Sequence, residues 1–263
     1  MASQDSTLVI DKVTVTSLLA VLVLLVSAYL SSLRLLPRGS STKVRILFVW
    51  HLFDALIHFF FEGSFLYNCF FTSLHIGQRA KYEYFTGRAP LELYPKDVHF
   101  LGRKDRYYGS FYGTNPTALL WQEYAKADAR WGGADLGVVS LELLTVFLGG
   151  PIASYICYLL TKGYGSTGTT GSNGFGGKLV FWMTVLATGE LYGGFMTFCP
   201  EWLTGSPNLD TSNFMYLWVY LVFFNMLWVV IPFWILYETY RSMTGASPLS
   251  EAVASSKDSK KLK

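Results

Sequence analysis

The chain has 263 residues, of which 51% are hydrophobic, 17% aromatic and only 15% charged. A soluble domain of this length would carry about 25% charged residues, and here the apolar residues lie in long runs. The composition therefore excludes an ordinary soluble protein and indicates an all-α, polytopic membrane protein. The formal net charge is +3, and the basic residues gather at the ends of the apolar runs, which argues against a nucleic-acid partner.

Five apolar stretches are long enough to cross a membrane as helices. They predict a bundle of five transmembrane helices with a long lumenal loop between the second and the third. Residues 1–12 precede the first span, residues 13–243 are expected to form one membrane domain, and residues 244–263 a disordered tail. The spans cover approximately residues 13–36, 44–71, 136–160, 179–199 and 214–237.

The charges in the short connections predict the orientation of these spans. Lys and Arg are concentrated in the first and third connections and after the last span, whereas the fourth connection carries Glu201 and Asp210 and no basic residue. The positive-inside rule therefore places the N-terminus in the lumen and the C-terminus in the cytosol. The chain ends in KKLK (260–263), which resembles a dilysine retrieval signal and predicts the endoplasmic reticulum membrane; the alternative is a solvated basic tail.

Two connections have unusual compositions. The glycine-rich segment 163–177 is expected to be a flexible tether, since no GK[ST] follows it and no strand precedes it to make a phosphate loop. The lumenal segment 72–135 is long for a helical bundle, and such loops are usually functional or disordered. Within it, residues 118–131 favour a helix in the lumenal interface, anchored by Trp121, Tyr124 and Trp131.

The second span carries four ionisable residues on one side of the helix. His58 and Glu62, at i and i+4, are direct neighbours in a regular helix. An ionisable group at mid-membrane depth is costly and normally faces the bundle interior, so this pair predicts a functional site. His51 and Asp54 lie nearer the cytosolic end, where pairing with the basic residues at positions 43 and 45 would give them a structural role.

Polar residues on the other spans lie at matching depths. Glu142 is level with Glu62, and Thr145 follows it at i+3 on the same face. Buried polar groups need partners, so we expect an apolar cavity lined by aromatic residues and holding a few acid–base groups. Each residue also has a structural alternative, such as helix packing or bonding to its own backbone. The remaining candidates are Glu190, Tyr192, Asn225 and Trp228.

An imidazole beside a carboxyl group in an apolar cavity keeps a proton mobile, as general acid–base catalysis requires. A nucleophilic hydrolase is less favoured because no Ser, Cys or Thr is clearly matched to His58. A zinc hydrolase would need three firm ligands, and the chain has only four histidines. The pattern therefore predicts proton transfer to an apolar substrate, with no metal and no cofactor.

Five motifs in order resemble the emopamil-binding-protein family, the Δ8-Δ7 sterol isomerases of the EXPERA superfamily. The similarity covers residues 44–243 apart from the long lumenal loop. The EYAKADARW run together with the H-x3-E and E-x2-T patterns is specific, whereas each alone would be weak. The motifs are HFFFEG (58–63), WQEYAKADARW (121–131), LELLT (141–145), GELYGG (189–194) and FFNMLW (223–228).

The resemblance implies an endoplasmic-reticulum protein that shifts a sterol ring double bond by adding and removing a proton. It implies His58, Glu62 and Glu142 as the catalytic acid–base groups. Expected partners are a sterol or terpenoid substrate, membrane lipid and cationic amphiphilic amines as inhibitors, and a homodimer stays open. The expected lining of the substrate or cation site is Thr145, Asn225, Trp228, Glu190, Tyr192 and Tyr124.

Two departures from the family pattern keep alternatives open. The lumenal loop carries an added segment at residues 78–114, within an insert that covers about residues 73–117. Glu190 stands where Gln is expected, and Gly194 where some members have Asp. One alternative is therefore an isomerase or cyclase for a non-sterol polycyclic terpenoid. Another is a non-catalytic protein that binds sterols or amphiphilic amines.

Overall fold

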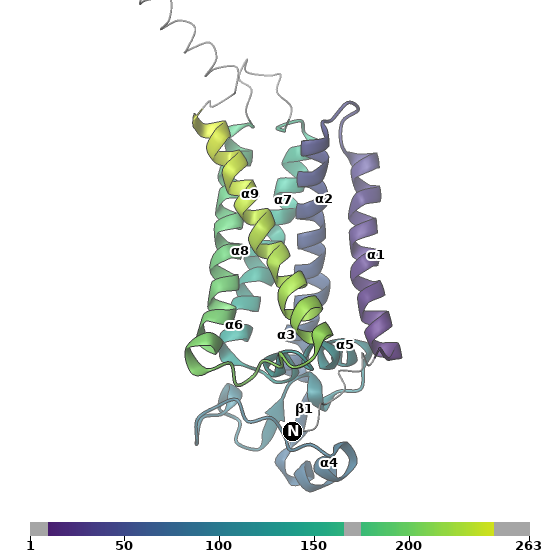
Figure 1. The fold of residues 1–263 in the computed structure, drawn as a ribbon, viewed down its shortest axis with the longest axis vertical. Helices are drawn as coiled ribbons and strands as arrows, with labels where there is room; N and C mark the ends of the chain where they lie inside the picture. Colours follow the sequence, from purple (N-terminus) through teal and green to yellow (C-terminus); the bar gives the residue numbers. More distant parts are fainter. Residues whose placement is uncertain (1–9, 166–174, 245–263) are drawn as a thin grey trace, which may run out of the picture.

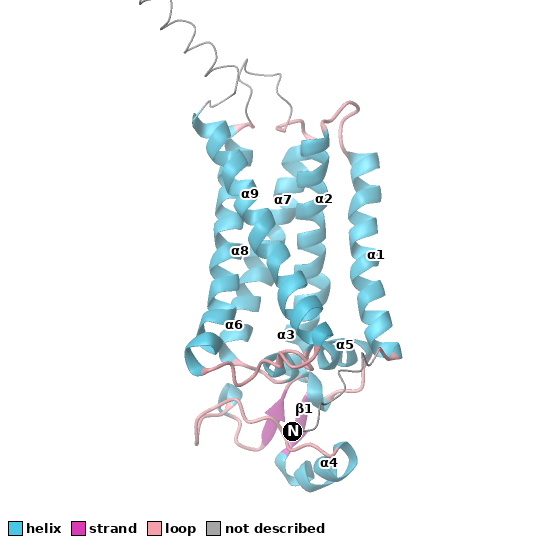
Figure 2. Cartoon of the chain, in the orientation of Figure 1, coloured by secondary structure: helices cyan, strands magenta, loops and turns pink. Residues whose placement is uncertain are grey.

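The computed structural model describes residues 10–165 and 175–244 as a helical bundle with a small lobe at one end (Figures 1 and 2). Within these residues, five helical runs are long and apolar enough to cross a membrane, which confirms the predicted all-α membrane fold. The last two runs extend further at their C-terminal ends than the sequence predicted. The runs are Lys12–Leu35, Thr42–Phe71, Leu136–Thr161, Gly177–Thr204 and Met215–Thr244.

Side-chain caps explain where several helices begin. Helix α1 (Lys12–Leu35) starts after Asp11, whose carboxylate accepts the backbone N–H of Thr14 at 2.9 Å, and Asp135 caps Leu136–Leu144 in the same way. Such caps satisfy the free N–H groups of the first helical turn. The predicted tail from residue 245 onward, with its dilysine-like end, lies outside the described residues, as do residues 166–174 of the glycine-rich tether.

Three of the five spans contain π-helical segments. These segments join regular helices on either side, so each span is continuous but locally wider than an α-helix. π-Helical turns inside α-helices occur frequently at functional sites. The second span is α2 (Thr42–Leu56), η1 (Ile57–Glu62) and α3 (Gly63–Phe71); the third is α6 (Leu136–Leu144), η6 (Thr145–Gly149) and α7 (Gly150–Thr161); the fifth is η7 (Met215–Phe224) and α9 (Asn225–Thr244).

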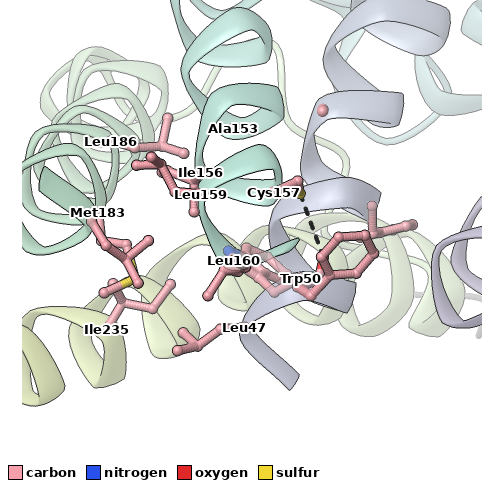
Figure 3. Close-up of a cluster of buried hydrophobic side chains, with 14 of the residues drawn as sticks. Leu47, Trp50, Ala153, Ile156, Cys157, Leu159, Leu160, Met183, Leu186 and Ile235 are labelled. Carbon is pink, nitrogen blue, oxygen red and sulfur yellow. Dashed lines mark hydrogen bonds between the residues drawn. The ribbon is translucent and has the colours of Figure 1, made fainter. Parts of the chain in front are cut away.

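The largest apolar core lies between α2, α7, α8 (Gly177–Thr204) and α9 (Figure 3). Leu47, Ile156, Met183 and Ile235, one from each helix, are fully buried there. Helix α1 stands at the edge of the bundle (Figure 1), packs against α2 and α5 (Pro116–Tyr124), and leaves most of its leucines exposed. Its outer face therefore suits a lipid environment.

The lobe between α3 and α6 contains a two-stranded antiparallel sheet and short helices. Strand β1 (Ser73–His75) pairs with β2 (Arg106–Tyr108), with Ser73 opposite Tyr108. The lobe is tied to the segment before α6 by the hydroxyl of Tyr94, which donates to the carbonyl of Ala134. Its helical elements are η2 (Ile76–Gln78), α4 (Arg79–Thr86), η3 (Phe100–Gly102), η4 (Ser110–Tyr112), α5 and η5 (Ala129–Gly132).

A glycine at position 109 allows two segments of this lobe to pack closely together. Gly109 has φ of +128°, and a Cβ there would lie 2.5 Å from the Cα of Gly133. We expect Gly109→Ala to destabilise the lobe by about 1–3 kcal/mol, measured as accelerated limited proteolysis of residues 73–115 in detergent. Gly102→Ala is the matched control, because φ is +68° but no atom lies within 4 Å; equal cleavage rates for the two variants would refute the close-packing argument.

The expected interfacial helix at residues 118–131 is wrong in two respects. Helix α5 ends at Tyr124, and a separate short helix follows at Ala129–Gly132. Trp121 and Trp131 do not anchor the segment in an outer interface, because they are only 6% and 8% exposed. Their rings stack on each other with centroids 4.8 Å apart, so this segment forms an aromatic cap over the bundle.

A buried ion pair holds the cap to the end of α8. The guanidinium of Arg130 donates to both carboxylate oxygens of Asp128, at 2.9 and 2.7 Å. It also donates to the carbonyl of Thr197 on α8 at 2.7 Å, and Glu201 lies 3.7 Å away. Because Asp128 and Arg130 are 0% and 4% exposed, this pair fixes the cap with little competition from water.

Candidate active site

The second span places an imidazole between two carboxyl groups. His58 lies in the π-helical segment η1, and its Nδ1 is 2.5 Å from Oε2 of Glu62. Its other ring nitrogen, Nε2, is 3.1 Å from Oδ1 of Asp54. The ring is only 2% exposed. Each ring nitrogen therefore faces a carboxyl oxygen of the same span, but only the contact at Nδ1 has hydrogen-bond geometry.

The third span brings a second carboxyl group to this pair. Thr145 Oγ1, at the start of η6, is 2.5 Å from Oε2 of Glu62 and 2.9 Å from Oε2 of Glu142. A hydroxyl has only one hydrogen to donate, so one of the two carboxyl groups must carry a proton for both contacts to be hydrogen bonds. Gly149 allows this approach, since a Cβ there would lie 3.2 Å from Nε2 of His58.

Asp54 belongs to the same network, although the sequence favoured a structural role near the cytosolic end. Its Oδ1 accepts the indole N–H of Trp228 on α9 at 2.8 Å, in addition to its contact with His58. Pairing with a basic residue is therefore wrong for Asp54, since Lys43 instead pairs with Glu238 at 2.6 Å. The i,i+4 spacing from Asp54 to His58, the same as from His58 to Glu62, was the signal that could have identified it.

His51 does not join this network. Its Nδ1 is 2.6 Å from the carbonyl of Leu47, one turn earlier in the same helix, and the residue is 1% exposed. Arg45 was the other expected partner. Its guanidinium instead donates to the hydroxyl oxygen of Ser32 at 3.3 Å. His51 therefore has the structural role that was expected, but with a backbone carbonyl rather than a basic side chain nearby.

Asn225 connects the fifth span to the aromatic cap. Its amide nitrogen lies 3.0 Å from the hydroxyl of Tyr124 and 3.0 and 2.9 Å from the carbonyls of Tyr220 and Leu221. These carbonyls lie at the end of η7, where the π-helical segment gives way to α9. Burial raises the pKa of the Tyr124 hydroxyl above its ordinary value, so Tyr124 stays neutral there. Asn225 thus both stabilises the junction and positions Tyr124.

A second polar cluster closes the cavity beside α1. Glu123 of α5 is 3% exposed, and its Oε1 accepts hydrogen bonds from the hydroxyls of Thr14 at 2.8 Å and Tyr220 at 2.9 Å. Its Oε2 accepts from the ammonium group of Lys126 at 2.5 Å. These contacts join α1, α5 and η7, and they occupy both oxygens of Glu123.

All of these elements surround one cavity of about 940 Å³, at the upper end of the range of small-molecule sites. Its walls are mostly apolar side chains of α1, α6, α8 and the fifth span, and Trp121 and Trp131 close the end at the cap. Tyr192 contributes to the lining but is 61% exposed. The predicted site residues that line it are His58, Glu62, Tyr124, Glu142, Thr145, Glu190, Tyr192, Asn225 and Trp228.

The EBP family model, described as EXPERA (EXPanded EBP superfamily), matches residues 116–239. The matched region runs from the start of α5 almost to the end of α9. It therefore includes the candidate residues of the cap and of the last three spans, such as Glu142, Glu190 and Asn225. It does not include His58 and Glu62, whose place in the site rests on the geometry described above.

The chain is also similar to curated proteins. It is 30% identical over 127 residues to the 3-beta-hydroxysteroid-Delta(8),Delta(7)-isomerase of Cavia porcellus, covering 48% of this chain and 50% of that one. It is 27% identical over 225 residues to the probable isomerase of the same name of Oryza sativa subsp. japonica, covering 86% and 79%. Isomeliandiol synthase of Melia azedarach is 27% identical over 118 residues, covering 45% and 49%. The chain thus spans about half the length of the mammalian relatives.

Proposed function

We propose that this chain, which is similar to the EXPERA superfamily of emopamil-binding proteins, is an intramembrane isomerase that shifts a ring double bond of a sterol from Δ8 to Δ7. The observation that supports this most is the contact of Glu62, Thr145 and Glu142 across two spans, at 2.5 and 2.9 Å. It holds a transferable proton at the wall of an apolar cavity of about 940 Å³.

The reaction begins with proton transfer from Glu142 to one carbon of the substrate alkene, which leaves a tertiary cation at the ring junction. Glu142 is better suited to this step than His58, because each nitrogen of His58 already faces a carboxyl group within 3.1 Å. The indole ring of Trp228 and the surrounding carboxylates stabilise the cation, the ring face by about 1–2 kcal/mol. A base then removes a proton from the neighbouring carbon, and no cofactor is consumed.

The charge of the reaction intermediate predicts which compounds inhibit the protein. A protonated amphiphilic amine carries the positive charge that the reaction intermediate carries, so it should compete with the sterol for the cavity.

The lobe, the start of α1 and the connection between α8 and η7 share one end of the bundle (Figure 1). We place that end in the lumen of the endoplasmic reticulum, with the C-terminus in the cytosol.

A non-sterol polycyclic terpenoid is the second candidate substrate. The similarity to isomeliandiol synthase favours it, as does the lobe, which adds a folded segment to the cap of the cavity. The acid and its supporting residues would be the same for either substrate. Only the shape of the cavity wall, and not the proton chemistry, separates the two candidates.

Incubation of the purified protein in liposomes with a Δ8-sterol tests the proposal. We expect the Δ7 isomer, of unchanged mass, and suppression of its formation by an amphiphilic amine. A panel of polycyclic terpenoid alkenes is assayed in parallel. Turnover of a terpenoid without turnover of the sterol would replace the first candidate by the second, and binding of both classes without conversion of either would refute an enzyme.

A further inference from the structure

The cavity wall must supply two proton-exchanging groups, because the proton is added to one carbon and removed from another. Glu142 serves as the acid, and most of the other ionisable groups of the wall make at least one contact with a neighbouring polar group. Nδ1 of His58 is bound to Glu62, and Nε2 faces Oδ1 of Asp54 at 3.1 Å without hydrogen-bond geometry. Oε2 of Glu62 is the acceptor for both His58 and Thr145, and Glu123 receives hydrogen bonds at both oxygens.

Glu190 is different, because both of its carboxylate oxygens are shielded from solvent and receive no hydrogen bond from the described residues. The residue lies in the middle of α8 and lines the cavity. Buried polar atoms without partners are rare and need an explanation. A carboxylate with free acceptor positions at the wall of a substrate cavity is suited to accept a proton from carbon.

Asp54, on the second span, is the charged group that acts most strongly on Glu190. Its Oδ2 also lacks a donor among the described residues. Two carboxyl groups that meet in an apolar setting are held together by a proton between them. Asp54 does not line the cavity, so it connects Glu190 to His58 from behind.

The site therefore contains two carboxyl pairs, one at each nitrogen of His58. Glu62 and Glu142 stand on the Nδ1 side, and Asp54 and Glu190 on the Nε2 side. We propose that Glu190 is the catalytic base that removes the substrate proton, and that Asp54 is a positioning residue that connects it through His58 to the acid. This inference rests on the proposed isomerase function.

The proton count closes without any further reactant. Glu142 loses a proton to one alkene carbon, where a C–H bond forms, and the other alkene carbon becomes the cation. Glu190 gains a proton from the carbon on the far side of that cation, where a C–H bond breaks and its electrons form the new double bond. The Asp54–Glu190 pair then holds one proton more than at rest. Single-proton shifts along Asp54, His58, Glu62 and Thr145 return a proton to Glu142, and the resting state is restored.

Glu190→Gln tests the base role through kinetics with the Δ8-sterol. We expect kcat to fall by at least about 100-fold while KM changes by less than about threefold, with partial recovery in Glu190→Asp. Thr184→Val is the matched control on α8, because the single bond of its hydroxyl within the described part of the chain is to the carbonyl of Val180, and the residue does not line the cavity. A wild-type kcat in Glu190→Gln, or a change confined to KM, would overturn the assignment.

Infrared spectroscopy tests the Asp54–Glu190 pair without any substrate. We expect the wild-type spectrum to contain a protonated-carboxyl band that is lost in Glu190→Gln and also in Asp54→Asn, but not in Thr184→Val. Unchanged bands in both variants would show that no proton is shared there and would remove the pair. Failure of the wild-type protein to convert any Δ8-sterol is a separate result: it removes the proposed function, and the base role with it, whatever the bands show.

Discussion

Glu142→Gln is expected to lower kcat for the sterol isomerisation by about 10²- to 10⁴-fold. Gln has nearly the shape of Glu and can still bond the hydroxyl of Thr145, 2.9 Å away in the native protein, but it has no acidic proton to give to an alkene. Folding should be unaffected, since the side chain keeps its volume and a hydrogen-bond partner. Turnover in liposomes and thermal unfolding in detergent, measured on the same preparation, separate the two effects.

The control for this variant is Thr184→Val, a polar-to-apolar change on α8 outside the cavity, which should retain wild-type turnover. A Glu142→Gln protein that unfolds at the wild-type temperature and turns over within about threefold of the wild-type rate would remove Glu142 from the acid role. If Glu142→Gln does not fold, Glu142→Asp is tested in its place. Asp keeps an acidic proton but holds it farther from Thr145. We expect the turnover of Glu142→Asp to exceed that of Glu142→Gln.

Arg130→Met is expected to destabilise the protein by about 3–5 kcal/mol, because it leaves the carboxylate of Asp128 buried without a counter-ion. Burial raises the pKa of Asp128, and the Arg130 guanidinium opposes that rise. The variant also loses the hydrogen bond to the carbonyl of Thr197, so the cap should separate from α8. The midpoint of denaturant unfolding in detergent measures the change.

An exposed ion pair of the lobe provides the control for Arg130. The side chains of Arg79 and Glu83 are 43% and 38% exposed at a separation of 2.8 Å, and exposed pairs contribute only about 0–1 kcal/mol. Arg79→Met should therefore leave the unfolding midpoint almost unchanged. Comparable losses in Arg79→Met and Arg130→Met would contradict the view that the buried pair fixes the cap.

Much of the scaffold could be predicted from the sequence, because the length of an apolar run sets where a membrane helix begins and ends. The contact of His58 with Glu62 followed from their spacing on one helix. The approach of Glu142 to Glu62 could be predicted because two ionisable groups buried at the same depth in the membrane need polar partners. Thr145 was expected on the face of Glu142, and the structure shows its hydroxyl between the two carboxyl groups.

The remaining features depend on packing that no local pattern encodes. The π-helical segments change which side chains face the cavity, and nothing in the sequence marked them. Asp54 was assigned by its depth rather than by its partner, which is Trp228 on another span. Trp121 and Trp131 looked like interfacial anchors, but each shields the other in a stack, and this depends on the fold of the lobe around them.

The central claim is that buried acids from separate spans lend a proton to a carbon–carbon double bond. It is tested most directly by a single turnover of Δ8-sterol with protein that has been equilibrated in deuterated water. The account predicts a Δ7 product of unchanged skeleton with one deuterium at the carbon that received the proton, and no such product from Glu142→Gln. A Δ7 product without deuterium in that first turnover would contradict it.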